Sequence, residues 1–176
     1  MMTKISLLAA AGFAALAMTT GAQAQTASAQ PYIGLSAGYH DTHVSGAAHD
    51  DGAIVGVIGG VDFPVGETLT IGVEGNYHVG TNAIDSEYGV AARLGFPVGH
   101  NSQLFVKGGY QEVNFDLHKL TGLSTLPAGL DDTDGDYLVG VGGEFGLGNS
   151  PARLRVGVDT ISFDTVRATA GVVWKF

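Results

Sequence analysis

Hydrophobic and polar residues alternate with a period of two along most of the chain after about residue 30. In the segment 32–42, Ile33 and Leu35 fall on one face, and Ser36 and His40 fall on the other. Because successive side chains of a strand point to opposite sides, this pattern predicts β-strands with one apolar face. Eight runs show it, at residues 32–42, 53–63, 69–79, 87–96, 103–113, 136–147, 152–160 and 165–176.

The lengths of the runs and of their connections predict a closed barrel. Each run has about ten residues, which is the length that a tilted strand needs to cross a bilayer. Connections after the second, fourth and sixth runs are short turns with Pro and Gly, whereas those after the first, third and fifth are longer and polar. The connection at 161–164 is short and departs from this rule. We predict an all-β fold over residues 31–176, an eight-stranded antiparallel up-and-down transmembrane β-barrel.

The first 24 residues do not alternate. Lys4 precedes an almost unbroken apolar run at 5–18, and Ala22-Gln23-Ala24 fits the small-x-small rule for signal peptidase. This predicts a signal peptide at 1–24, cut after Ala24, and a short flexible leader at 25–30. A single membrane helix is the alternative, but the run is shorter than the ~20 residues that span a bilayer.

Alternation alone does not tell which face of the barrel points outward. A secreted lipocalin-like barrel, apolar inside, is the alternative. The glycine-rich polar face carries five charged residues near the strand middles, which suits a narrow lumen: Glu74, Arg93, Lys107, Glu144 and Arg155. Aromatic residues gather at the ends of the apolar face, as an interface girdle requires: Tyr39, Phe63, Tyr77, Tyr88, Phe96, Tyr110, Tyr137, Phe145, Trp174 and Phe176. These features favour a membrane barrel whose apolar face meets lipid.

The five charged residues are expected to pair, since an unpaired charge in a narrow lumen is costly. Two interpretations stay open for this network. It fills the lumen and fixes the register of the strands, or it forms a switchable gate of a small pore. The first is favoured because eight strands leave little open lumen.

The segment 32–39 and the last strand resemble the eight-stranded outer-membrane family that includes the membrane domain of OmpA, OmpX and the opacity proteins. The resemblance covers residues 31–176. It implies the outer membrane of a Gram-negative bacterium as the location after signal-peptide cleavage, with lipids and lipopolysaccharide around the barrel. Periplasmic chaperones and the barrel-assembly machinery are the implied partners during biogenesis, and Trp174 and Phe176 the implied C-terminal assembly signal. No peptidoglycan-binding domain follows the barrel, so no tether to the cell wall is expected.

Composition narrows the chemistry further. The chain has no cysteine, which excludes disulfides and thiolate metal sites. Its formal net charge of −9 makes it a poor binder of nucleic acid. The acidic run at 131–136 resembles the start of a calcium loop but lacks EF-hand spacing, so a solvated loop surface is favoured over cation bridges to lipopolysaccharide. His40, His43 and His49 match no strong metal pattern, and no cofactor is expected.

Lipid A modification is the enzymatic alternative. It would need a serine, a histidine and an acid at the lipid-facing rim. His40 or His43 with Ser36 or Ser45 is a loose candidate, but Ser36 and His40 fall on the predicted lumen face. We therefore expect a non-enzymatic integral outer-membrane protein that acts through its surface loops, in adhesion, surface interaction or envelope integrity. A small pore is the other alternative, and the extracellular partner is not identified by the sequence.

Overall fold

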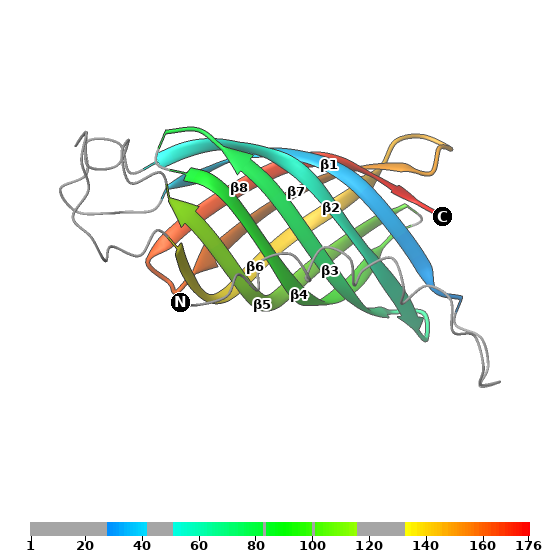
Figure 1. Ribbon diagram of the computed structural model, residues 1–176. Coiled ribbons are helices and arrows are strands. Elements are labelled where there is room, and N and C mark those ends of the chain that lie inside the picture. Colours follow the sequence, from blue (N-terminus) through cyan, green and yellow to red (C-terminus); the bar gives the residue numbers. More distant parts are fainter. Residues whose placement is uncertain (1–27, 42–50, 83, 100, 116–132) are drawn as a thin grey trace, which may run out of the picture.

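A computed structural model describes residues 28–41, 51–82, 84–99, 101–115 and 133–176. Eight antiparallel strands form one closed barrel in chain order (Figure 1). The strands are β1 (Gln30–Asp41), β2 (Asp51–Val65), β3 (Leu69–Gly80), β4 (Ile84–Val98), β5 (Ser102–Phe115), β6 (Thr133–Gly146), β7 (Ala152–Ile161) and β8 (Thr165–Lys175). The predicted fold class is confirmed. The predicted signal peptide and the first half of the predicted leader, residues 25–27, lie outside the described residues.

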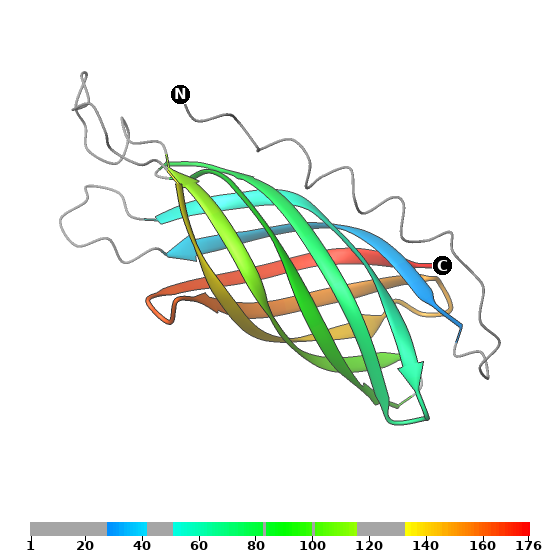
Figure 2. The same cartoon turned by 60° about the horizontal axis from the view of Figure 1, so that its bottom comes forward.

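The barrel closes where the first and last strands pair. β1 runs antiparallel to β8, from Tyr32 opposite Lys175 to Asp41 opposite Val166. This pairing leaves no open sheet edge along the strands, so backbone groups are satisfied between neighbours all round the barrel. Figure 2 shows the strong tilt of the strands in this closed sheet. Within the described residues, no helix is long and apolar enough to cross a membrane.

Burial alternates along each strand as the sequence predicts. In β2, Val55 and Val57 are exposed on the outside, whereas Ile54 and Ile58 are buried in the lumen. All ten aromatic residues assigned to the apolar face point outward, and only Tyr88 among them is half-buried. The outside is therefore the apolar face, as an outer-membrane barrel requires.

The two ends of the barrel differ. Short connections after β2, β4 and β6 lie at the end that also holds the C-terminus, which we call the turn end (Figure 1). Gly66, Gly99 and Gly148 have φ near +65° there, a conformation that glycine adopts without strain. The opposite end, the loop end, bears the connections 42–50 and 116–132, which lie outside the described residues. The short β7–β8 turn is also at the loop end, with Ser162 and Phe163 at positive φ.

Small apolar clusters occupy parts of the lumen. One cluster, toward the loop end, contains Ile54, Ile84, Ala91, Val113, Leu138 and Ile161, and a second contains Tyr32, Ile58 and Val173. The remaining lumen is mostly polar. Glycines on the inward face make room for it, and Gly171 lies so close to β1 that an added Cβ would sit 2.2 Å from the Leu35 carbonyl oxygen.

This contact predicts unequal effects for two glycine substitutions in the lumen. Gly171→Ala should destabilise the barrel by roughly 1–3 kcal/mol, since the methyl group meets backbone and forces the strands apart. Gly157→Ala should be tolerated, because the nearest atom to its Cβ, the Val141 carbonyl oxygen, is 3.5 Å away. Urea unfolding of both variants in lipid vesicles measures the difference. Equal losses in the two variants would contradict the contact.

Candidate functional site

The lumen is the largest collection of charged side chains in the described part of the chain. Ten charged residues point inward, and their charges balance: the acids Asp62, Glu74, Glu87, Glu144 and Asp159 and the bases Arg93, Lys107, Arg155, Arg167 and Lys175. Each acid is at most 3 % exposed. Because the charges balance inside the barrel, the network needs no bound ion to neutralise it.

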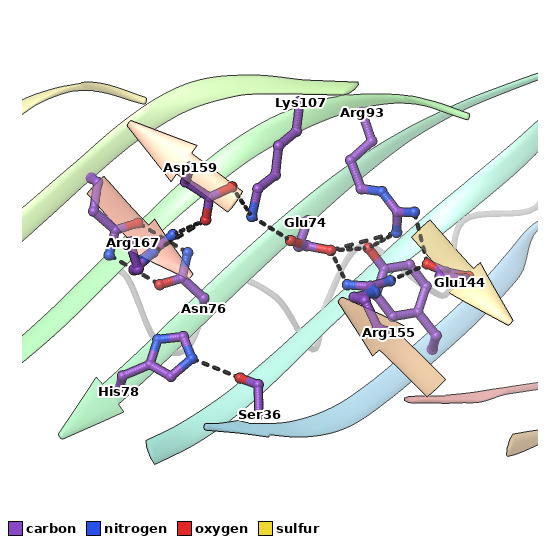
Figure 3. Close-up of polar contacts among 12 residues, drawn as sticks. Ser36, Glu74, Asn76, His78, Arg93, Lys107, Glu144, Arg155, Asp159 and Arg167 are labelled. Atoms are coloured by element: carbon purple, nitrogen blue, oxygen red, sulfur yellow. Dashed lines mark hydrogen bonds and ion pairs between the residues drawn. The ribbon is translucent and has the colours of Figure 1, made fainter. Parts of the chain in front are cut away.

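Four of the five predicted residues lie together on the turn side of the lumen (Figure 3). We call them the turn-side cluster: Glu74, Arg93, Glu144 and Arg155. The Arg93 guanidinium lies 2.8 Å from the Glu144 carboxylate, and Arg155 lies 2.5 Å from the same oxygen. Arg155 also contacts Glu74, which accepts a 2.8 Å hydrogen bond from the Tyr32 hydroxyl. Arg93 also lies 3.5 Å from Glu74, so both arginines contact both glutamates, an arrangement that the five donors of an arginine allow.

Two aromatic rings line this cluster. The Arg93 guanidinium is 4.3 Å from the centre of the Phe105 ring, and that of Arg155 is 4.7 Å from the centre of the Tyr32 ring. These are cation–π distances. Phe105 interrupts the alternation of its run, and the structure gives a reason: its ring fills the lumen beneath an arginine.

The loop-side cluster was not predicted from the sequence. Arg167 lies 2.5 Å from Glu87 and 2.7 Å from Asp159. Two histidines approach the same glutamate, His40 through Nδ1 at 2.8 Å and His78 through Nδ1 at 3.3 Å. His40 was expected on the lumen face, but neither Glu87 nor Arg167 was predicted to meet it there. Alternation could have identified both residues. Glu87 lies an even number of positions from the inward Arg93 on β4, and Arg167 lies an even number from the inward Lys175 on β8.

Lys107 joins the two clusters. Its Nζ lies 3.4 Å from Glu74 and 3.2 Å from Asp159 (Figure 3). The structure therefore brings all five predicted lumen residues into one network. A cavity of about 20 Å³ remains beside Lys107, Ser36 and His78. A space of this size holds about one water molecule.

The serine of the enzymatic candidate has a different histidine partner in the structure from the one expected. Ser36 is hydrogen-bonded to His78 at 2.7 Å, not to His40, and His78 in turn faces Glu87. The order serine, histidine, acid is that of a hydrolytic triad. However, Ser36 is only 7 % exposed, and the cavity next to it is too small for an acyl chain. His43 and Ser45 lie outside the described residues.

The remaining candidate sites receive no support from geometry. Among the described residues, no group of three or more His, Asp or Glu side chains is arranged to hold a metal. His49 and the acidic pair Asp131 and Asp132 lie outside them. Trp174 points outward and Phe176 is 77 % exposed at the turn end, where its backbone N–H donates to the Pro31 carbonyl. Their role in assembly stays a prediction.

Solved structures with a similar fold come from bacterial surface proteins. Ail, the attachment invasion locus protein of Yersinia pestis, in complex with the heparin analogue sucrose octasulfate, has 12% identity and a TM-score of 0.53, over 84% of this chain and 97% of that one. Neisserial surface protein A has 13% identity and a TM-score of 0.50, over 85% and 99% of the two chains. At such identities the likeness concerns the fold alone.

Sequence comparison assigns the family. Among curated proteins, none matches this sequence. The family model described as the outer membrane protein beta-barrel domain matches residues 6–176. The apolar exterior, the closed meander and this match agree with one another, and the chain belongs to the family of outer membrane proteins with a β-barrel domain.

Proposed function

We propose that this protein is a non-enzymatic outer-membrane barrel that contacts other surfaces through its loop end, while the ion-paired lumen serves as a structural plug. The observation that carries the proposal is the filled lumen. Its acids are paired with bases, and the cavity left beside Lys107 has room for about one water molecule. Transport through such a lumen is disfavoured, which leaves the loop end for function.

The proposed orientation rests on a rule for outer-membrane barrels. In these barrels short turns face the periplasm and longer loops face the exterior, so the loop end faces outward from a Gram-negative cell. Residues 1–24 act as a cleaved signal peptide in this proposal. Lipids and lipopolysaccharide surround the apolar face. Periplasmic chaperones and the assembly machinery recognise Trp174 and Phe176 during biogenesis.

Charge at the loop end restricts the kind of partner. The described acids outside the lumen there are Asp41, Asp51, Asp85, Glu112, Asp134, Asp136 and Asp164. All described lysines and arginines except Arg153 belong to the lumen network, and the segments 42–50 and 116–132 contain one lysine and no arginine. Ail was crystallised with a heparin analogue. We propose that this chain does not share that ligand class, because like charges repel sulfated polyanions.

A small pore is the second candidate. Lys107 bridges the two clusters through contacts of 3.2 and 3.4 Å, so its movement would divide the network at the cavity. The plug is favoured over the gate because Arg93, Arg155 and Arg167 stay in the lumen when Lys107 moves.

Conductance distinguishes plug from pore. Wild-type protein in planar lipid bilayers should show no single-channel steps, and Lys107→Ala should show none either, since the remaining arginines still fill the lumen. Heat-modifiable migration on gels verifies that both proteins are folded. Reproducible steps in the wild type, or steps gained by the variant, would favour the pore.

The plug should also contribute to stability. Glu74→Gln removes a buried carboxylate that faces Arg155, Lys107 and Arg93. We expect a loss of about 3–5 kcal/mol in the free energy of unfolding, because breaking a buried ion pair leaves its partner uncompensated. Urea unfolding in vesicles measures the loss. Asp164→Asn at the exposed β7–β8 turn is the control and should change stability by less than about 0.5 kcal/mol.

Heparin chromatography checks the restriction on partners. Refolded wild-type protein should pass through a heparin column at low salt. A variant with Asp51→Lys, Asp85→Lys and Asp134→Lys should be retained, since its rim carries three cations in place of three acids. Retention of the wild type that salt abolishes would mean that the acidic rim does not determine ligand class.

A further inference from the structure

On five of the eight strands, the loop end of the lumen is lined by aliphatic side chains. Toward this end, five strands each turn one aliphatic residue inward. We call them the aliphatic cap: Ile54 of β2, Ile84 of β4, Val113 of β5, Leu138 of β6 and Ile161 of β7. Their exposed fractions lie between 0 % and 6 %, and Phe115 packs against them. Together with Ala91 they form one cluster.

Charged and amide groups lie directly beneath the cap. Along the inward face of β4, Glu87 is the buried residue that follows Ile84. On β5 and β7, Gln111 and Asp159 occupy the inward positions next to the cap residues. All three side chains are at most 1 % exposed. The cap therefore lies between these three groups and the loop end. On the β1–β8 side, Thr165 is opposite Ile161 and lies 3.2 Å from His40, so this hydrogen-bonded pair completes the layer.

The turn end of the lumen has no comparable layer in the described residues. Polar side chains continue to that end, where Lys175 lies 2.8 Å from Asp62 and the Gln103 amide donates to the Thr70 hydroxyl at 2.7 Å. Apolar side chains are thus more numerous toward the loop end than toward the turn end, where Tyr32, Ile58 and Val173 form the smaller cluster. This asymmetry is not required for filling the barrel, because polar side chains fill the other end.

A packed aliphatic layer has a known effect on ions. An ion that enters it must lose its hydration without gaining partners, and hydrophobic constrictions close channels by this desolvation. The layer also excludes water from the ion pairs below, which strengthens them because attraction between charges is greater in a medium of low dielectric constant.

We propose that the aliphatic cap is a desolvation barrier that seals the loop end of the lumen against external ions and polar solutes. The seal is separate from the ion-pair network, so cutting the network at Lys107 leaves it in place. This inference goes beyond the proposed function: it concerns access to the lumen and holds whichever partner the loops contact.

Thiol accessibility tests the cap. The native chain has no cysteine, so Ser36→Cys places one reporter thiol beside the cavity beneath the cap. Its rate of reaction with a small cationic methanethiosulfonate is measured in folded protein in detergent micelles, and Ser150→Cys at an exposed turn gives the rate of a free thiol. Thr169→Cys, which lines the same cavity, serves as a second reporter if Ser36→Cys does not fold.

The cap is then opened in the reporter background. Ile84→Ser and, separately, Leu138→Ser place a hydroxyl in the cap. Val173→Ser is the matched control, because Val173 is as buried as Ile84, both 0 % exposed, but packs with Tyr32 and Ile58 away from the cap. Heat-modifiable migration shows which variants are folded.

We expect the reporter thiol to react far more slowly than the exposed thiol while the cap is intact. A folded cap variant should raise its rate roughly tenfold or more, since a wetted layer admits the reagent, and Val173→Ser should not. Three outcomes would overturn the seal: fast labelling with the cap intact, no acceleration in folded cap variants, or equal acceleration by Val173→Ser. If neither serine variant folds, Ile161→Ala takes their place and must accelerate labelling more than Val173→Ala does.

Discussion

The structure depends on the pairing of charges inside a space that is nearly closed to water. Five acids and five bases point into the lumen, where an unpaired charge would be costly. Arg93 and Arg155 share Glu144, and Lys107 lies between Glu74 and Asp159. Every strand except β1 contributes at least one of these ten residues, and β1 contributes Tyr32 and His40 as partners of Glu74 and Glu87. The network thus couples the register of one strand to that of its neighbours, because a shift by one residue would turn a charge toward lipid.

The outer face and the lumen require different side chains, and period-two alternation places each kind on its own face. An outward position needs an apolar side chain, and an inward position needs either a small residue or a partnered polar one. At Gly171 the missing side chain lets β8 approach β1 closely. At Arg155, by contrast, a long side chain on β7 reaches across the lumen to Glu74 on β3. Tyr32 and Phe105 add rings that cover the guanidinium groups. The same side chains therefore fill the lumen and balance its charge.

Alternation predicted the strands well because it is a local property of the backbone. The five residues named from the sequence meet in the lumen because each lies mid-strand with inward parity. Glu87 was left out of the predicted network because its run was expected to begin at residue 87, whereas β4 begins at Ile84. His40 is buried in the lumen, as alternation predicts, but alternation does not identify Glu87 as its partner. Pairing across the barrel, as between Arg167 and Glu87, depends on strand tilt, which the pattern along one strand does not contain.

Among the described residues, every lysine and arginine except Arg153 lies inside the barrel, which changes the charge that the surface presents when the chain folds. In the unfolded chain, arginines and lysines are interspersed with the acids, and any anionic surface meets both signs. In the barrel, Arg93, Lys107, Arg155, Arg167 and Lys175 are withdrawn together with an equal number of acids. The net charge is unchanged, but the surface that remains is acidic with hardly a base to offset it. Folding thus replaces a chain of mixed charge by a barrel whose described outer charges are acidic except for Arg153.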